Sequence, residues 1–420
     1  MVEERYKQSE VGFIPSDWNC LPITDLLRNQ AGSIKIGPFG SQLHKKYLTT
    51  RGYKVYGQSN VYQKDISIGD RYISEDRFKL LQTCEVKEGD FLISMMGTIG
   101  KCYIVPGDFL PGIIDSHLIR IRFDSSKANS EYILHLFQSP IIISQVEKLS
   151  VGGIMEGLSS KIIKNLCFPI PEVSEQNKIA KVLSDLDILI KNLEKLIAKK
   201  CAIKTAVMQQ LLTGKTRLPG FTEKWVTKRL GDICTFSKGG GLSKKNINIS
   251  CGIPAIPYTS IFTDFDEIFM YDQVNKFTKE KNLVTIDSPH LLIAGSSNML
   301  ENVGKVSGYI SKNKIAIGGD VIIASTDEDI PFLSFLLNTE VHRRKIVDLS
   351  QGSTIRHVYP STFNEYAINI PNERKEQRSI SQVIFEVMNE IKSLDNEVRK
   401  IKMIKNGMMQ ELLTGRTRLI

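Results

Sequence analysis

The chain has 420 residues, of which 41% are hydrophobic and 24% charged, and its formal net charge is +9. This length excludes a single hydrophobic core and predicts two domains plus a spacer. No run of about 18 apolar residues could span a membrane, and the start from Met1 to Arg5 is not a signal peptide, so we expect a soluble, cytoplasmic protein.

The positive charge is concentrated in two segments. Residues 171–224 hold 10 basic and 6 acidic side chains, and residues 371–420 hold 10 and 7, so these segments supply +4 and +3 of the net +9. The remainder is nearly neutral, and charge alone supports nucleic-acid binding only weakly. If the remainder binds DNA, local clusters or another subunit must contact the phosphates.

Residues 1–170 are predicted to form a mixed, mostly β domain. The domain opens with Gly12-Phe13-Ile14-Pro15-Ser16-Asp17-Trp18, and we expect Trp18 to be a packing anchor. Short strands bounded by Gly, Pro or Asp are predicted at 54–56, 90–94, 101–105 and 117–123, followed by a helix from 131.

Residues 171–224 are predicted to contain one long helix. From Glu175 to Thr213, apolar residues recur at the three-and-four spacing of one helical face, and Gly214 stands where a C-cap is expected. A helix of this length would be roughly 58 Å long, at about 1.5 Å per residue. That is too long for a lid on one compact domain, so we expect a coiled-coil spacer.

Residues 225–370 repeat the order of the first domain. The segment from Gly220 to Trp225 echoes the first opening, and strands are predicted at 290–293, 304–306, 315–317 and 320–323 before a helix at 331–337. The two domains are otherwise only faintly similar. This pattern indicates a duplicated scaffold that carries two divergent surfaces.

Residues 371–420 repeat the long helix at an offset of 201 residues. Glu376-Gln377 matches Glu175-Gln176, and Leu412-Leu413-Thr414-Gly415-Arg416-Thr417-Arg418-Leu419 matches Leu211-Leu212-Thr213-Gly214-Lys215-Thr216-Arg217-Leu218. The first copy continues into Gly220 and Trp225, whereas the matching text for the second copy stands at the start of the chain. The repeat is therefore circular, which an antiparallel helix pair with pseudo-twofold symmetry explains.

Two loops offer side chains suited to reading DNA. Gln and Asn can pair with adenine, Lys can pair with guanine, and Lys also holds phosphates. The alternative for any one residue is a solvated loop position. The candidates are Lys35, Ser41, Gln42, His44, Lys45, Lys46, Gln58 and Asn60 in the first domain, and Lys238, Ser243, Lys244, Lys245, Tyr258 and Ser260 in the second.

Motifs for catalysis are absent from the sequence. There is no phosphate-binding loop with Gly-Lys-Ser/Thr, no Asp/Asn-Pro-Pro-Tyr/Phe methyltransferase motif, and no metal-ligand spacing among the six histidines. The seven cysteines are scattered, and Cys234 and Cys251, the closest two, are 17 residues apart. This spacing argues against a disulfide framework and a zinc site, so we expect buried or incidental thiols.

Over its whole length, the chain resembles the specificity (S) subunit of type I restriction-modification systems. The resemblance rests on the two copies of the Glu-Gln motif and of the Leu-Leu-Thr-Gly ending. In addition, Gly37 to Leu43 and Gly239 to Lys245 resemble the opening loops of two different classes of target recognition domain. We therefore expect a mixed α/β tandem repeat: target recognition domains at 1–170 and 225–370, and helical spacers at 171–224 and 371–420.

The resemblance implies a non-catalytic DNA-binding protein. Each target recognition domain would read one half of a bipartite, asymmetric site in double-stranded DNA, and the helices would set the spacing and dock two modification (methyltransferase) subunits. Restriction subunits would complete the complex. The partners would bind S-adenosylmethionine, ATP and magnesium, whereas this chain would bind no cofactor. Helix faces left bare without the partners are candidates for self-association.

Two alternatives stay open. A coiled-coil scaffold or dimerisation protein would use the helices without reading DNA, and a methyltransferase or nuclease would act alone. The first predicts no preference on a random DNA library. The second predicts that the purified chain modifies or cuts DNA unaided. The recognised bases cannot be derived from one chain.

Overall fold

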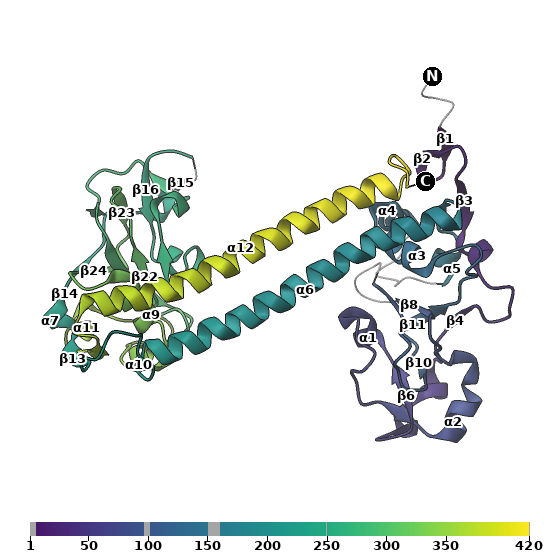
Figure 1. Cartoon of the computed structure of the whole chain (residues 1–420), viewed down its shortest axis with the longest axis horizontal. Helices are drawn as coiled ribbons and strands as arrows, with labels where there is room; N and C mark the ends of the chain where they lie inside the picture. Colours follow the sequence, from purple (N-terminus) through teal and green to yellow (C-terminus); the bar gives the residue numbers. More distant parts are fainter. Residues whose placement is uncertain (1–5, 96–100, 150–159, 249, 420) are drawn as a thin grey trace. The chain divides into compact units, whose positions relative to one another are not determined.

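The computed structural model describes residues 6–95, 101–149, 160–248 and 250–419 (Figure 1). The chain divides into two compact units. Unit 1 comprises residues Met1–Glu194 and Asn396–Ile420, and unit 2 comprises Lys195–Asp395. Each unit therefore contains one mixed domain and one half of each long helix, α6 (Val173–Leu211) and α12 (Arg374–Leu412).

Unit 1 is built on two four-stranded sheets with the orders β10-β6-β7-β5 and β4-β11-β8-β9, and β3 pairs antiparallel with β12. Its strands are β1 (Tyr6–Ser9), β2 (Gly12–Pro15), β3 (Asn19–Pro22), β4 (Ile34–Ile36), β5 (Leu48–Thr49), β6 (Tyr53–Tyr56), β7 (Tyr72–Ile73), β8 (Phe91–Ser94), β9 (Cys102–Ile104), β10 (Gly112–Ile114), β11 (Leu118–Ile121) and β12 (Cys167–Ile170). Its shorter helices are α1 (Gln58–Gln63), α2 (Glu75–Leu80), α3 (Ser130–Phe137), α4 (Pro140–Leu149) and α5 (Ser160–Lys164), with single 3₁₀ turns at Ile23–Leu26 and Gln82–Cys84.

Unit 2 is built on two five-stranded sheets with the orders β14-β24-β20-β22-β17 and β15-β18-β16-β23-β19, and β13 pairs with β26 as β3 does with β12. Its strands are β13 (Val226–Arg229), β14 (Cys234–Lys238), β15 (Ile247–Asn248), β16 (Ile253–Ile256), β17 (Ile268–Phe269), β18 (Phe277–Thr278), β19 (Thr285–Ile286), β20 (His290–Ala294), β21 (Ser296–Ser297), β22 (Val306–Tyr309), β23 (Ile315–Ile317), β24 (Val321–Thr326), β25 (Arg356–His357) and β26 (Ala367–Ile370). Its shorter helices are α7 (Leu230–Ile233), α8 (Ser260–Thr263), α9 (Ile330–Leu337), α10 (Glu340–Asp348) and α11 (Pro360–Asn364), with 3₁₀ turns at Lys244–Asn246 and Tyr271–Gln273.

Each unit has two hydrophobic cores, one on each face of its central sheet. In β8, Phe91 and Ile93 join the core that includes residues of α6 and α12, whereas Leu92 joins the second core. In β20 of unit 2, Leu291 and Ile293 likewise join one core and Leu292 joins the other. Because both faces are buried, these strands read as continuous apolar runs, and this explains why the sequence predicts them well.

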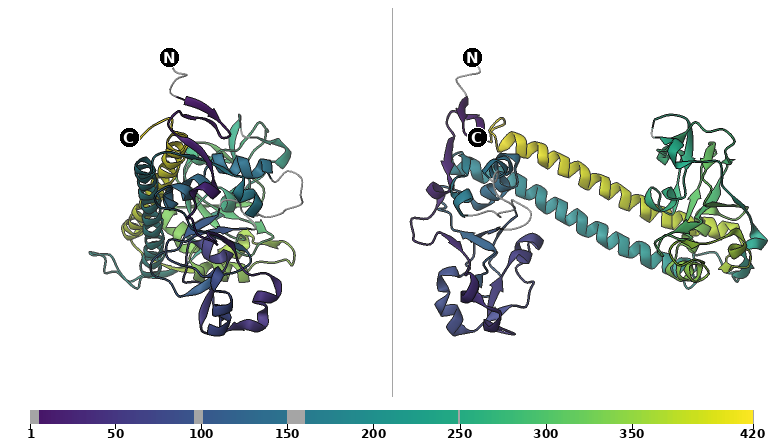
Figure 2. Two further views of the ribbon diagram at one scale, coloured as in Figure 1. Left: turned by 90° about the vertical axis from the view of Figure 1, so that its right-hand side faces the viewer. Right: turned by 180° about the vertical axis from the view of Figure 1, so that it is seen from behind.

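The long helices run antiparallel within each unit (Figures 1 and 2). In unit 1, Lys405 pairs with Asp187 at 2.6 Å and Lys402 pairs with Glu194 at 2.7 Å. In unit 2, Lys200 pairs with Glu390 at 2.5 Å. The predicted long helices, their direction and the mixed α/β class are confirmed. Among the described helices, none is long and apolar enough to cross a membrane.

In each unit, a buried glutamate at the start of one long helix pairs with an arginine that follows the end of the other long helix. We call this pairing the closure of the unit. Glu175, at the start of α6, is 4% exposed and accepts two hydrogen bonds of 2.7 Å from Arg418, which follows α12. Trp18 is fully buried, donates from Nε1 to Glu175 and lies under the Arg418 guanidinium. Trp18 is therefore the packing anchor that the sequence predicts, and the chain's two ends meet in unit 1.

Unit 2 repeats this closure with the equivalent residues. Glu376 is 2% exposed and accepts bonds of 2.5 and 2.7 Å from Arg217, while Trp225 donates to the same carboxylate at 3.4 Å. The glycine before each arginine-bearing turn has positive φ, 68° at Gly214 and 69° at Gly415. A Cβ atom at either position would lie 3.2 Å from the tryptophan ring of its unit, so both positions favour glycine. Both glycines thus cap the helices as predicted.

The glutamine of each Glu-Gln motif joins the long helix to its domain. The side chain of Gln176 accepts from the backbone of Asn129 and donates to the carbonyls of Lys127 and Pro171. Gln377 likewise accepts from the backbone of Asp329 and donates to the carbonyl of Pro371. Both amides are fully buried, so each is satisfied by groups at fixed positions in the domain.

The expectation that the cysteines stay unpaired is wrong at one place. Cys20 and Cys167 form a disulfide between the paired strands β3 and β12. They are 147 residues apart in sequence, so spacing alone could not indicate that strand pairing would bring their Cα atoms to 5.8 Å. Among the described cysteines, Cys84, Cys102 and Cys234 are buried and free, as expected.

The two units differ where α3 and α9 contact the long helices. In unit 1, fully buried His135 lies 3.1 Å from the Ser184 hydroxyl and 4.0 Å from the Asp187 carboxylate. In unit 2, the equivalent positions are occupied by Phe335 and Phe385, whose rings meet edge to face. A polar contact in one copy therefore replaces an apolar contact in the other.

We predict that replacing Arg418 by Met destabilises unit 1 by about 3 kcal/mol, because it leaves the buried Glu175 carboxylate without its partner. Arg416→Met is the matched control, since Arg416 is mostly exposed and its contact with Glu411 is 3.7 Å long. We expect the control to change the free energy of unfolding by less than about 1 kcal/mol. Equal effects of the two substitutions in chemical denaturation would contradict the closure.

Acid should weaken unit 1 through His135. Burial, assisted by the positive charge of Lys405 and opposed by Asp187, lowers the pKa of His135 to about 4. The unfolded chain, with a pKa near 6.5, binds the proton first. The contribution of His135 is therefore complete above pH 6.5 and is lost as the pH falls through 4.

His135→Phe should reduce this pH dependence, measured as the free energy of unfolding between about pH 7 and pH 4. His342 in unit 2 provides the internal control, because burial also lowers its pKa to about 4. Its contribution to the pH dependence of stability should be the same in the variant and in the unmodified chain. An unchanged slope in the variant would show that His135 does not govern the acid response.

Candidate nucleic-acid interface

The first candidate loop lies on the surface of unit 1 and consists of two short 3₁₀ turns, Gly40–Leu43 and Lys45–Tyr47. At its start, Gly37 packs so closely on Asp115 that a Cβ atom would lie 2.0 Å from the Asp115 carbonyl oxygen. The loop then turns outward at Gly40, which has a φ of 53°. The predicted residues of this loop are all exposed: Ser41, Gln42, His44, Lys45 and Lys46.

Arg77 of α2 holds this loop from the side. Its Nε donates to the Gln42 carbonyl at 3.0 Å, and its Nη2 donates to the carbonyls of Gln42 and Ser41. The guanidinium lies 3.9 Å from the centre of the Tyr47 ring. All these contacts of Arg77 are with the backbone or with Tyr47. Within the loop, His44 accepts from the Lys46 amide at 3.4 Å, and Lys46 Nζ lies 5.1 Å from the centre of the Tyr47 ring.

The other predicted residues of unit 1 differ in accessibility. Lys35 is partly exposed on β4, opposite Arg120 of β11. Gln58 is partly exposed at the start of α1 and donates to the Ser94 hydroxyl at 2.8 Å. These two residues are not part of the exposed loop that carries the Ser41–Lys46 set.

Asn60 is placed inside the fold. It is 2% exposed, its Oδ1 accepts from the Gly57 amide, and its Nδ2 donates to the carbonyls of Asp65 and Ile68. The amide therefore uses both donors and one acceptor on the backbone of its own loop. This arrangement gives Asn60 a structural role and leaves it no exposed edge for a base.

The second candidate loop follows β14 in unit 2. Lys238, the last residue of β14, is exposed, and its Nζ lies 5.2 Å from the centre of the Tyr359 ring. Ser243 and Lys245 are exposed in the turn that follows, whereas the side chain of Lys244 is outside the part of the chain that the structure describes. The Glu280 carboxylate accepts from the Ser243 amide at 2.8 Å and from the Asn246 side chain at 2.7 Å.

Of the two remaining predicted residues of unit 2, Tyr258 is partly exposed and Ser260 is buried. Tyr258 is partly buried and meets Phe262 edge to face. Ser260 is 1% exposed and accepts from Lys276, whose Nζ also binds Asp264 at 2.6 Å. Burial raises the pKa of Asp264, but hydrogen bonds from Lys276, Ser260 and Thr263 outweigh it and lower the pKa. This pair stabilises the fold around Ser260.

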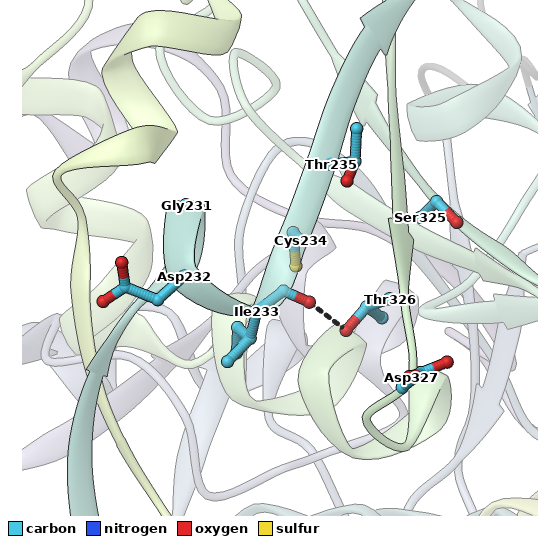
Figure 3. A pocket seen from close by; sticks show the side chains of 8 residues that line it. All are labelled: Gly231, Asp232, Ile233, Cys234, Thr235, Ser325, Thr326 and Asp327. Atoms are coloured by element: carbon cyan, nitrogen blue, oxygen red, sulfur yellow. Dashed lines mark hydrogen bonds between the residues drawn. The ribbon is translucent and has the colours of Figure 1, made fainter.

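Two cavities of unit 2 are lined by residues outside the candidate loops. In unit 2, a cavity of 310 Å³ is lined by residues 231–235 and 325–327, and the Thr326 hydroxyl donates to the Ile233 carbonyl across it at 2.6 Å (Figure 3). A larger cavity of 770 Å³ lies between α6, α10 and β26. Neither includes a predicted DNA-binding residue. Among the described residues, no group of three or more His, Cys, Asp or Glu side chains could hold a metal ion.

Arg77, Glu280 and Tyr359 were not among the predicted site residues. Each acts on a loop 35 or more residues away in sequence, and none stands in a recognisable motif. Only the tertiary fold brings α2, the residues after β18 and the N-cap of α11 next to the loops. The exposed polar side chains were predictable from composition, whereas the residues that hold them were not.

The family model described as "Type I restriction modification DNA specificity domain" matches the chain twice, at residues 15–199 and 222–403. The chain belongs to this family. Each match contains one mixed domain and most of one long helix, so the duplication seen in the structure is a duplication of the family's domain.

A relative from Methanocaldococcus jannaschii, the type I restriction enzyme MjaVIII specificity subunit, is 22% identical over 435 residues, covering 99% of this chain and 97% of the relative. The crystal structure of a type I restriction-modification S subunit from M. genitalium has a TM-score of 0.58 at 16% identity, with 94% of this chain and 96% of that one covered. A chain from a study of type I restriction-modification complex assembly has a TM-score of 0.54 at 14% identity, covering 96% and 99%. At these identities, the structural similarities establish the specificity-subunit fold.

We predict that Asn60→Ala lowers the stability of unit 1 by about 2–4 kcal/mol, because it removes three hydrogen bonds and leaves buried backbone groups unsatisfied. Ser59→Ala is the matched control, since Ser59 is the exposed neighbour on the same helix. Denaturation of both variants measures the difference. A stable Asn60→Ala protein with altered DNA recognition would return Asn60 to the interface.

Proposed function

We propose that the chain is the DNA specificity subunit of a type I restriction-modification complex, in which each unit reads one half of a bipartite, asymmetric site. The observation that carries the proposal is the combination of one shared frame with two different surfaces. Glu175 and Glu376 close the two units in the same way, yet the exposed loops differ in sequence and in the residues that hold them. Two such loops are suited to two different half-sites.

The exposed residues divide into two chemical roles. Lys45, Lys46, Lys238 and Lys245 are suited to phosphates, whereas Gln42 and the serines Ser41 and Ser243 are suited to base edges. Because the domains carry little net charge, we propose that a partner subunit supplies much of the remaining phosphate contact. Both candidate loops are needed for the full site.

We further propose that two modification subunits bind this chain and that restriction subunits complete the complex. A frame present twice offers the same docking surface twice, which supports two copies of one partner. S-adenosylmethionine, ATP and magnesium would be bound by these partners, and this chain would choose the site without catalysing a reaction. The complex would act in the cytoplasm, where the DNA is accessible to it.

The long helices are proposed to set the distance between the half-sites. Each is 39 residues long, or roughly 58 Å at about 1.5 Å per residue. Reading heads on one face of DNA lie about one helical turn apart, near 34 Å. The gap would therefore depend on helix length.

Affinity purification of the tagged chain from its host tests the partner assignment. Mass spectrometry should find two adenine methyltransferase subunits per chain, and the chain alone should neither methylate nor cut DNA with S-adenosylmethionine or magnesium. Recovery of the chain with partners unrelated to DNA would favour a coiled-coil scaffold instead. Methylation or cleavage by the purified chain alone would make it an enzyme.

Inserting four residues after Lys195 and four after Asn396, equivalent positions of the two helices, should widen the recognised gap. Four residues add roughly 6 Å and slightly more than one helical turn, so the helix faces stay close to their original register. We expect a gap longer by one or two base pairs with unchanged half-sites, measured by mapping methylated adenines. An unchanged gap would exclude the helices as the spacer.

A further inference from the structure

The two candidate reading loops are held by side chains of opposite charge. In unit 1, the Arg77 guanidinium donates to the backbone carbonyls of Ser41 and Gln42. In unit 2, the Glu280 carboxylate accepts from the backbone of Ser243 and the side chain of Asn246. Each anchor binds the first part of its loop and comes from a different element of the same unit.

Both anchors are fixed by the elements that carry them. Arg77 lies in α2, which begins at the N-cap Ser74, and its guanidinium is also held over the Tyr47 ring at 3.9 Å. Glu280 is the second residue after β18, and its backbone amide donates to the hydroxyl of Thr278, which is fully buried in that strand. Each loop is therefore tied to a rigid element at a point next to the residues proposed to read DNA.

We propose that Arg77 and Glu280 are positioning residues for specificity, each for one half-site. This inference rests on the proposed function. Direct readout needs side chains held in register with base edges, and a loop without its anchor would sample several positions. Neither anchor has to contact a base, because both act on the loop that does.

The opposite charges also have different consequences for DNA affinity. Arg77 adds positive charge beside Lys45 and Lys46, so its removal weakens phosphate attraction as well as loop position. Glu280 places negative charge beside Ser243 and Asn246, in the loop that also carries Lys245. Its neutralisation therefore favours phosphate binding and also releases the loop. Loss of specificity with unchanged or tighter binding is thus expected only in unit 2.

The test uses the full chain in complex with its methyltransferase subunit and maps methylated adenines in genomic DNA. Arg77→Met should lower discrimination about tenfold at one or more positions of one half-site, and Glu280→Gln should do so in the other half-site. In each variant the untouched half should keep its discrimination within about twofold. Binding of Glu280→Gln to non-specific DNA should be unchanged or tighter.

Charge-matched controls separate position from charge. Lys79→Met removes one positive charge from the same helix as Arg77, where Lys79 pairs with exposed Glu75. Glu365→Gln removes one negative charge from unit 2 at an exposed pair with Arg229. Both should leave the two half-sites unchanged. Arg77→Lys keeps the charge but loses the fork of donors, so it should relax the same half-site as Arg77→Met.

The possible outcomes separate a failure of the positioning role from a failure of the proposed function. If the wild-type complex shows a bipartite motif, and both Arg77→Met and Glu280→Gln recognise it with full discrimination, the positioning role is overturned and the proposed function stays intact. Loss in both halves by a variant with an unchanged unfolding midpoint would also overturn it. A wild-type complex that methylates without any sequence motif would overturn the proposed function itself.

Discussion

The structure depends on two buried carboxylates that the chain must neutralise from a distance. Glu175 and Glu376 each stand at the start of a long helix with almost no exposure to solvent, and an unpaired carboxylate there would cost several kcal/mol. The arginine that pairs with each follows the end of the opposite helix copy. This requirement explains the circular repeat, since Arg418 can meet Glu175 and Trp18 only if the last turn of the chain returns to its beginning.

The two units share the same closure but differ in the side chains at equivalent positions elsewhere. Where unit 1 has His135 beside Ser184, unit 2 has Phe335 against Phe385, and where unit 1 holds its exposed loop with Arg77, unit 2 uses Glu280. None of these differences touches the Glu-Gln motifs, the capping glycines or the tryptophans. The exposed loops can therefore diverge without loss of the closure, which suits the proposed reading of two different half-sites.

The features predicted well from the sequence are those with a strong local pattern. The long helices follow from an apolar stripe repeated at an offset of 201 residues, and strands such as β8 and β20 follow from runs buried on both faces. The glycine caps and Trp18 were predicted because their surroundings repeat. In each case, one physical requirement acts on residues close together in the sequence and produces a pattern that can be recognised there.

The features that escaped prediction depend on contacts across the fold. Asn60 and Ser260 look like base-reading residues because they are polar and follow strands, but burial assigns them to the fold's own hydrogen bonds. The Cys20–Cys167 pair depends on the pairing of β3 with β12. Arg77 and Glu280 carry no motif, and only tertiary packing brings them to their loops. Exposed loop composition could be read from the sequence, whereas the support of each loop could not.

The most direct test of two reading units on one frame is selection of duplexes from a random DNA library by the chain in complex with its methyltransferase subunit. We expect enrichment of two short, different half-sites separated by a gap of fixed length and free sequence. Enrichment of one contiguous element, or of no sequence at all, would contradict it.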